Sequence, residues 1–315
     1  MSSVFGPLAL VQSSLRRLAR RLPPALGKAP EAQPQVSVLV PVFNHAPYLG
    51  EALESALGQS LRPHEVLCLD DGSTDDSLAV AQRFARDYPE VRVEHRANRG
   101  AHATLNELLG EARAPLVAIL NSDDVWHPAR LERCAAALGP AHAAVSTGLV
   151  TIGPDGAPAA NPWLDDALAW HALHGDLAAG LCYGNFVSTT SNLLARREAL
   201  LRLGGFDALR YTHDQELLLR LCSSGEGLRL LEARLLAYRV HPANTIKERP
   251  GEVRAEWAAV LAAHARKAGR SAAFDAAVAA RGLGEEVAAA ALVLESLPAD
   301  ARASAVLARR GAPQP

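Results

Sequence analysis

From residue 36 onward, short apolar runs alternate with amphipathic segments. The runs at 36–40, 65–69, 91–94 and 116–120 are rich in Val, Leu and Ile and have the length of strands. The segments between them, at 48–57, 76–88 and 102–112, carry apolar residues at helical spacing, and Ser73 and Asp76 have the spacing of a capping box before the second segment. Strands of this length joined by helices predict a doubly wound, mainly parallel α/β sheet with helices on both faces.

The pattern becomes less regular after residue 127. We expect a helix at 128–138, a strand at 143–152, a turn at 154–156 and an irregular stretch to about residue 170. Further strands are expected at 189–195 and 235–240, with helices at 198–203 and 214–223. Beyond residue 250 the chain is rich in alanine, is interrupted at Gly269, Gly282 and Gly284 and ends in a Gly-Pro tail, which predicts a core domain at 36–248 followed by a helical C-terminal region at 249–315.

Residues 1–35 differ in character from the rest of the chain. Leucines share one broad face of an amphipathic helix, four arginines lie between positions 16 and 21, and Pro23 and Pro24 end the pattern. A basic amphipathic helix suits an anionic lipid surface, its own domain or a second copy of the chain. We therefore expect an extension and linker at 1–35, in which residues 1–24 make a peripheral membrane contact, a homo-oligomer contact or an internal packing contact.

Composition and charge exclude several classes of protein. The 315 residues have a formal net charge of -2, so there is no basic surplus for general nucleic-acid binding. The four cysteines lack C-x-x-C spacing and lie in apolar or helical contexts, as expected for reduced core thiols. There is no apolar run of the roughly 18 to 20 residues that a membrane span needs, and no signal-peptide pattern. We expect a cytoplasmic protein, free or peripheral at the inner face of the membrane.

Three of the expected strands end in polar or acidic residues. The first runs into PVFN at 41–44, the second into DDGSTD at 70–75 and the fourth into NSDD at 121–124. Ligands bind at the carboxyl ends of parallel strands, so we expect these residues to share one site. Adjacent carboxylates suit a divalent cation and its phosphate ligand, and an acid at 70–71 with Phe43 nearby suits a nucleobase. A helix N-cap is the alternative interpretation of each acidic run.

The first strand is not followed by G-x-G-x-x-G, and the chain contains no G-x-x-x-x-G-K-[ST]. A dinucleotide-binding dehydrogenase needs the glycines of the first pattern for the close approach of its pyrophosphate, and a P-loop enzyme needs the second pattern. Both classes are therefore disfavoured.

Read in order, these segments resemble glycosyltransferase family 2. The resemblance rests on residues 36–44, 70–75, 98–100 with Asn106, 121–124, the GGFD at 204–207 and the HD at 213–214 with Leu218 and Arg220, and it covers about 36–245. It implies a GT-A fold and an enzyme that moves a sugar from a nucleoside diphosphate to an acceptor hydroxyl with inversion, in polysaccharide or glycoconjugate synthesis. Two other functions stay open: a sugar-phosphate nucleotidyltransferase and a non-catalytic nucleotide-sugar-binding or scaffold protein.

The resemblance also implies roles for individual residues. Asp214 matches the catalytic base, and Asp123 matches the acid that binds Mg²⁺ or Mn²⁺, with Asp124 and His241 as further candidate ligands. The candidate contacts to the diphosphate or to a carbohydrate or glycolipid acceptor are Arg239, His213 and Trp126. The residues that the resemblance implies for binding of the donor nucleotide are Pro41, Phe43, Asn44, Asp70, Asp71, Asn98, Asn121 and Ser122. The chain departs from the family at Asn121, where many members have Asp, and at His213, where Glu is usual.

Overall fold

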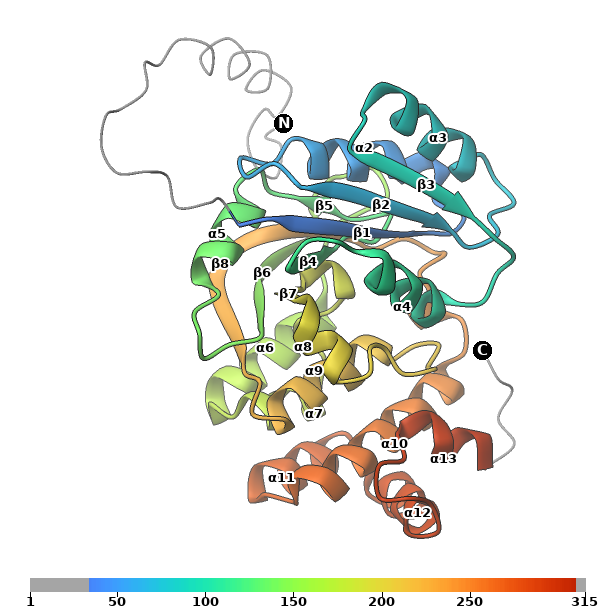
Figure 1. The fold of residues 1–315 in the computed structure, drawn as a ribbon. Coiled ribbons are helices and arrows are strands. Elements are labelled where there is room, and N and C mark those ends of the chain that lie inside the picture. Colours follow the sequence, from blue (N-terminus) through green and yellow to red (C-terminus); the bar gives the residue numbers. More distant parts are fainter. Residues whose placement is uncertain (1–33, 310–315) are drawn as a thin grey trace.

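The computed structural model describes residues 34–309, so the expected membrane or homo-oligomer contact through residues 1–24 lies outside the described part of the chain. Within residues 34–309, eight strands form one sheet in the order β3-β2-β1-β4-β7-β6-β8-β5 (Figure 1). The strands are β1 Val36–Val42, β2 Glu65–Asp70, β3 Val91–His95, β4 Leu116–Ile119, β5 Val125–Trp126, β6 Ala144–Ile152, β7 Leu194–Arg196 and β8 Leu228–Arg239.

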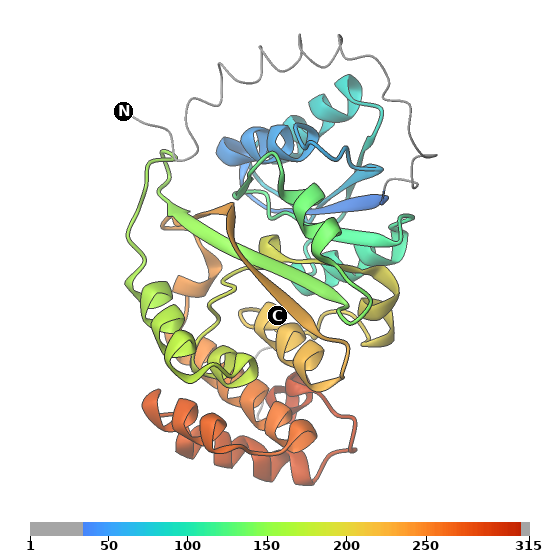
Figure 2. The same ribbon diagram turned by 90° about the vertical axis from the view of Figure 1, so that its left-hand side faces the viewer.

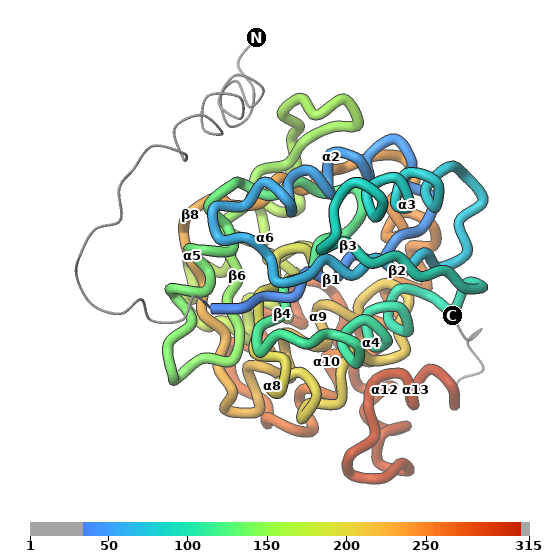
Figure 3. The backbone as a smooth tube through the Cα atoms, turned by 45° about the horizontal axis from the view of Figure 1, so that its top comes forward, coloured from blue at the N-terminus to red at the C-terminus, as the bar shows by residue number. Residues whose placement is uncertain are grey.

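Helices cover both faces of this sheet, as expected. Figure 1 and the tube view of Figure 3 show α2 and α3 on one side of β1 and β2, and α4 on the other. The helices are α2 Ala46–Leu57, α3 Ser77–Asp87, α4 Ala101–Glu111, α5 Arg130–Ala137, α6 Pro162–His174, α7 Leu177–Tyr183, α8 Arg197–Arg202, α9 His213–Ser223, α10 Pro250–Ala268, α11 Ala272–Ala280, α12 Gly284–Glu295 and α13 Ala303–Arg309, with the short 3-10 turns η1 Thr190–Asn192 and η2 Thr245–Lys247. No helix within 34–309 is long and apolar enough to span a bilayer.

The parallel half of the sheet confirms the pattern of the first 120 residues. Strand β1 pairs in parallel with β2 and with β4, with Val42 opposite Asp70 and Leu39 opposite Ile119. This register brings the carboxyl ends of the three strands to one edge. Each strand is almost fully buried because helices pack on both of its faces, which explains why β2 and β4 read as continuous apolar runs.

The second half departs from the expectation in several places. Strand β7 has only three residues and pairs antiparallel with β4 and β6, and the two-residue β5 was not predicted. The stretch expected to be irregular contains α6, whose start is set by the side chain of Asn161 accepting from the N–H of Leu164 and by Pro162 in the first turn. The expected capping box is also wrong, because Ser73 accepts from the N–H of Asn44 and Asp75 bonds the first N–H of α3.

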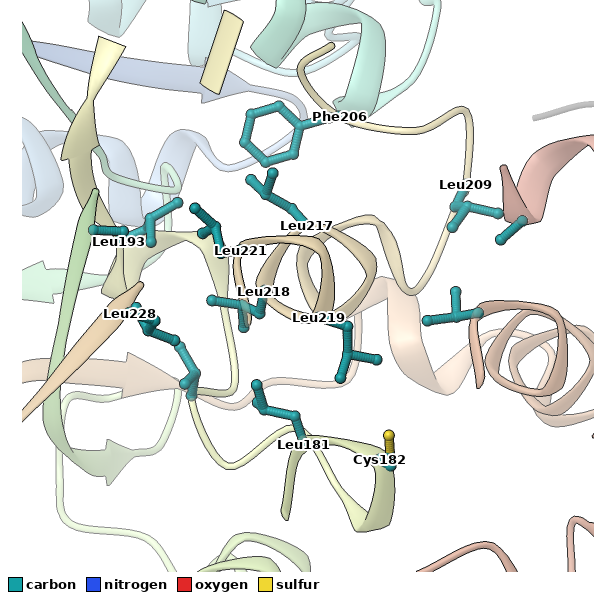
Figure 4. Close-up of a cluster of buried hydrophobic side chains, with 14 of the residues drawn as sticks. Leu181, Cys182, Leu193, Phe206, Leu209, Leu217, Leu218, Leu219, Leu221 and Leu228 are labelled. Atoms are coloured by element: carbon teal, nitrogen blue, oxygen red, sulfur yellow. The ribbon is translucent and has the colours of Figure 1, made fainter. Parts of the chain in front are cut away.

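The helices after residue 249 pack onto the sheet domain through α7 and α9. Figure 2 shows α10 to α13, in orange and red, lying below α6, α7 and α9. One continuous hydrophobic cluster contains leucines of α9 together with Leu261 of α10 and Val306 of α13. In Figure 4, Leu217, Leu218, Leu219 and Leu221 project from α9 in several directions, with Phe206 beyond Leu217. Helix α9 is therefore buried on most of its circumference, which fixes the position of its N-terminal residues.

Candidate active site

A cleft of about 450 Å³ opens where β1, β2 and β4 end, and it extends to the first turn of α9. The strand ends supply one wall, and the segments at 188–190, 210–214 and 243–248 supply the others. The expected site residues that line it are Pro41, Phe43, Asn44, Asp71, Asn98, Asn121, Ser122, Asp123, His213 and Asp214. Segments more than 150 residues apart in the sequence therefore contribute to one cavity.

Two histidines and one aspartate form a compact group at this cleft: His45 and Asp123 line it, and the buried His241 contacts Asp123. The Nε2 atom of His241 lies 3.0 Å from Oδ2 of Asp123, and Nδ1 of His45 lies 3.9 Å from Oδ1 of the same carboxylate. One ligand atom from each of the three residues lies within 4.8 Å of the other two. Burial lowers the pKa of His45, which favours the neutral imidazole, the form that binds metals. Two nitrogens and a carboxylate oxygen at this spacing fit a divalent cation such as Mn²⁺.

The group is held by residues that surround His241. The ring of Tyr48 lies 5.0 Å from that of His241, and Asn244 accepts the His241 N–H at 2.6 Å. The guanidinium of Arg239 lies 4.9 Å from the centre of the Tyr48 ring, and the same ring contacts His241. Ser122 lies 2.9 Å from Nδ1 of His45 and fixes that ring from the β4 side. Supporting contacts of this kind orient ligands before an ion arrives.

Sequence reasoning overlooked His45, although it directly follows the expected Asn44 at the end of β1. The signal was present: β1 and β4 lie side by side, so a histidine after β1 can approach an acid after β4. The outward turn of the chain at Asn44, which has a φ of 52°, places His45 at the start of α2 and within reach of Asp123.

Three expected contacts are corrected by the positions of their side chains. Trp126 is 1% exposed and donates its indole N–H to the carbonyl of Ser191, so it packs in the core and does not stack on a sugar. Arg239 is also 1% exposed, and its guanidinium donates to Glu51 and to the Asp123 carbonyl, which leaves it behind the cleft wall. Asp124 lies outside the His45, Asp123 and His241 group.

Asp124 instead ties the end of β8 to β4. Its carboxylate accepts the backbone N–H of Arg239 at 2.9 Å and the hydroxyl of Thr189 at 3.4 Å. Burial, and after it the neighbouring charge of Asp123, raise the pKa of Asp124 well above its usual range. Because His241 follows β8 by two residues, Asp124 helps to set the position of the second histidine.

The acids after β2 shape the nucleotide side of the cleft. Asp71 accepts the N–H groups of Arg99 and Gly100, each at 2.9 Å, and the guanidinium of Arg96. A carboxylate has about four lone-pair directions, so one remains on Asp71, which lines the cleft. Asp70 is corrected: it is fully buried, accepts from the N–H of Ser73 and lies 3.1 Å from the His95 ring, and does not line the cleft.

The remaining nucleotide candidates lie along the same wall. Phe43 is 44% exposed and presents an apolar ring to the cleft. Asn44 accepts from the N–H of Thr74, which joins the ends of β1 and β2. Asn121 donates to Thr189 and accepts from Thr190, so it links β4 to the turn η1. With both ends of its amide engaged, Asn121 supplies no charged ligand to the group of His45, Asp123 and His241, which we call the ion group.

Asp214 lines the same cleft from the first turn of α9. Its Oδ2 accepts from the side chain of Asn185 at 2.8 Å, and its Oδ1 accepts from the N–H of Gln215 at 2.7 Å. Burial raises the pKa of Asp214 to about 6, although both hydrogen bonds act in the other direction. A carboxylate with a pKa near 6 is ionised at neutral pH and remains a competent proton acceptor. Asn185 was not predicted, because it lies in the stretch between α7 and η1 where no strand or helix pattern drew attention to it.

The neighbouring His213 lines the cleft beside Asp214. Burial lowers the pKa of His213, so its imidazole is neutral at neutral pH. Where the family usually has a carboxylate, this chain therefore presents an uncharged ring.

The GGFD landmark precedes α9 and is fastened to α4. Asn106 accepts the N–H of Phe206 at 2.8 Å and donates to its carbonyl at 2.9 Å. Gly205 has a φ of 64°, and a Cβ at this position would lie 2.2 Å from Oδ1 of Asn106. Glycine is therefore required both by the backbone conformation and by the close approach of Asn106.

We expect Gly205→Ala to lower the free energy of unfolding by about 2 to 3 kcal/mol, because the methyl group must displace Asn106 in addition to straining the backbone. Gly204→Ala is the matched control: its φ is 80°, but its Cβ would meet only Arg302 at 3.5 Å. Urea denaturation of both variants measures the difference. If both variants lost the same free energy of unfolding, the two hydrogen bonds between Asn106 and Phe206 would contribute nothing to stability.

Comparison with known proteins gives consistent matches. The family model described as Glycosyl transferase family 2 matches residues 37–204, more than half of the chain. An uncharacterized glycosyltransferase of Nostoc sp. is 30% identical over 67% of this chain and 66% of its own length. Chondroitin synthase of Escherichia coli is 36% identical over 32% of this chain and 15% of its own length. The chain thus spans just under two thirds of the first relative and a small part of the second.

The fold also matches a solved structure. The mannosyltransferase PcManGT of Pyrobaculum calidifontis, in complex with GDP-Man and Mn²⁺, has a TM-score of 0.56 with 21% identity, covering 96% of this chain and 86% of that one. At this identity the likeness concerns the fold, and it confirms the expected GT-A architecture. The family match ends at residue 204, before Asp214 and His241.

Proposed function

Since the chain belongs to glycosyl transferase family 2, we propose that it is a metal-dependent inverting glycosyltransferase that moves a sugar from a nucleoside diphosphate to an acceptor hydroxyl. One observation carries this proposal: His45 and Asp123, which belong to a compact group with His241, line the same cleft as Asp214. A leaving diphosphate needs positive charge, and an attacking hydroxyl needs a base. The cleft offers residues for both.

Asp214 is the proposed base. As the acceptor oxygen forms its bond to the anomeric carbon, the hydroxyl proton passes to the Asp214 carboxylate. The bond from the anomeric carbon to the diphosphate oxygen breaks, and its electron pair stays on the diphosphate. Attack from the face opposite the leaving group inverts the anomeric centre. Asn185 holds one carboxylate oxygen and leaves the carboxylate oriented at the cleft wall.

The ion group would hold the metal through Asp123, His241 and His45. A divalent cation bound there supplies positive charge that stabilises the departing diphosphate. Imidazole nitrogens are poor ligands for Mg²⁺ and good ligands for Mn²⁺ and later transition metals, so this donor set favours Mn²⁺ of the two ions expected from the sequence.

The donor nucleoside would lie along the wall formed by Pro41, Phe43, Asp71 and Asn98. Phe43 offers an exposed ring for stacking, and the free lone pair of Asp71 can accept an N–H of the base. The acceptor would enter from the side of His213 and the segment at 243–248. A carbohydrate or glycolipid acceptor in polysaccharide or glycoconjugate synthesis fits the chondroitin synthase among the relatives, and the acceptor and linkage remain part of the proposal.

The first test is thermal stabilisation by candidate donors. We expect at least one nucleoside diphosphate sugar to raise the melting temperature by several degrees with Mn²⁺ and by much less without it, because a ligand bound only by the native state stabilises that state. Differential scanning fluorimetry with UDP-, GDP- and dTDP-sugars, each with Mn²⁺, Mg²⁺ or EDTA, measures the effect.

Two results would oppose the proposal. If a donor raised the melting temperature equally in Mn²⁺ and in EDTA, donor binding would not depend on a metal. Metal-dependent donor binding without transfer to water or to any oligosaccharide acceptor would favour the non-catalytic nucleotide-sugar-binding alternative.

A further inference from the structure

The loop that leads into α9 is held by a glutamate from the C-terminal helices. Glu256 of α10 is 7% exposed, and its carboxylate faces three successive backbone N–H groups. Its Oε1 accepts from Arg210 at 2.8 Å, and its Oε2 accepts from Tyr211 at 2.8 Å and from Thr212 at 3.0 Å. The hydroxyl of Thr212 donates a fourth bond at 3.2 Å. A carboxylate that fills such a concave set of N–H groups fixes the backbone conformation.

This loop has no comparable local support. Thr212 is the N-cap of α9, but its side chain makes no capping bond to the helix. Among residues 34–309, the hydrogen bonds that satisfy the N–H groups of 210–212 therefore come from α10, more than 40 residues further along the chain. Two residues after Thr212 comes Asp214, so the direction in which the carboxylate enters the cleft depends on these bonds.

A second contact from the C-terminal helices acts on the same loop. Ser304 of α13 donates its N–H and its hydroxyl to Asp207 of the GGFD landmark. Arg302 donates to the carbonyls of Gly204 and Gly205. The segment from 204 to 212 is thus fastened at both of its ends by helices that lie beyond the region matched by the family model.

We propose that Glu256 is a positioning residue for the reaction: through the backbone of 210–212 it sets the place of the base Asp214 and of the cleft residues Arg210 and Tyr211. This inference rests on the proposed function for its catalytic consequence. Glu256 touches no part of the cleft itself, and it is not among the residues that line it. Its effect should appear in the turnover step and not in donor binding, because the donor wall and the ion group belong to other elements.

The test is Glu256→Gln. The amide keeps the size of the side chain but turns one acceptor oxygen into a donor that opposes a backbone N–H. We expect kcat to fall at least tenfold while the KM for the donor stays within twofold, and we expect the pH midpoint of kcat to move from its wild-type value because the burial of Asp214 changes. Amide hydrogen exchange of 210–212 should become faster in the variant, while exchange in β1 and β4 stays unchanged.

Glu286→Gln is the matched control. Glu286 of α12 pairs at the surface with Arg254 of α10, so the substitution removes a glutamate that bonds α10 without touching 210–212. We expect its kcat, KM and exchange rates to equal those of the wild type. If Glu256→Gln fails to fold, Thr212→Val is the second variant, because it removes only the hydroxyl bond to Glu256. We expect it to lower kcat and to speed amide hydrogen exchange of 210–212 in the same direction, by a smaller amount.

The outcomes separate the two hypotheses. An active Glu256→Gln enzyme with unchanged kcat and unchanged exchange overturns the positioning role and leaves the proposed function intact. If the wild-type chain transfers no sugar, the proposed function fails, and hydrogen exchange still decides on Glu256: unchanged protection of 210–212 overturns the inference, and faster exchange supports it.

Discussion

Asp214→Asn is expected to abolish sugar transfer while leaving donor binding intact. The amide cannot accept the proton of the attacking hydroxyl, and loss of a general base typically costs about 10² to 10⁴ in rate. Donor binding should persist, because the wall with Phe43 and the group of His45, Asp123 and His241 belong to other elements than α9. Single-turnover transfer measures the loss, and calorimetry with the donor and Mn²⁺ measures binding.

The pH dependence of kcat in the wild-type enzyme is a second test of the role of Asp214 as base. The pKa of Asp214 lies at about 6. The base must be ionised to act, so kcat should fall about tenfold per pH unit below pH 6 and reach a plateau above it. A control variant, Asp166→Asn on α6, alters a carboxylate that pairs with Arg281 outside the cleft and should keep the wild-type profile. Retained turnover in Asp214→Asn would exclude the base role outright.

The raised pKa also predicts a stability difference of defined sign. An unfolded aspartate has a pKa of about 3.9, so folding favours the protonated form of Asp214. That contribution is fully present below about pH 4 and is lost as the pH rises through about 6. At pH 8 the wild type therefore carries a buried charge that Asp214→Asn lacks, and the variant should be more stable by on the order of 1 to 2 kcal/mol even after losing one of the two hydrogen bonds from Asn185 and Gln215. At pH 4 the gain should vanish.

The sequence alone predicted the part of the fold that repeats. Continuous apolar runs, such as 65–69 and 116–120, become buried strands because helices cover both faces of the sheet. Because these strands are parallel neighbours in one sheet, the polar residues that follow them reach the same edge. The pattern places Asp123 after a strand and Asp214 at the start of a helix, and the resemblance to glycosyltransferase family 2 is what singled out these two acids as metal ligand and base.

The expectations that failed depended on contacts between distant segments. Trp126 and Arg239 are polar at their tips, and nothing local shows that these tips bond Ser191 and Glu51, 65 and 188 positions away. His45 approaches Asp123 only after β1 and β4 pair. Glu256 is similar: within its helical, alanine-rich stretch it reads as a solvated surface charge, and its role appears only when α10 packs against the loop before α9.

Asp123→Asn is expected to remove metal-dependent binding of the nucleoside diphosphate. The amide is neutral and still reaches His241, so the fold should survive, but the ion group loses the one negative charge among its three members. We expect the affinity for Mn²⁺ with a nucleoside diphosphate to fall about 100-fold or more, and binding without metal to stay weak and unchanged.

Calorimetric titration of Mn²⁺ and of the Mn²⁺ nucleoside diphosphate measures this loss, and the electron paramagnetic resonance of bound Mn²⁺ reports on the site independently of turnover. Asp87→Asn, at the exposed end of α3, removes the same charge from the chain outside the cleft and controls for the change in net charge. His45→Gln should give an intermediate loss, because it removes one neutral nitrogen and keeps the carboxylate. Wild-type affinity in Asp123→Asn would take Asp123 out of the metal site.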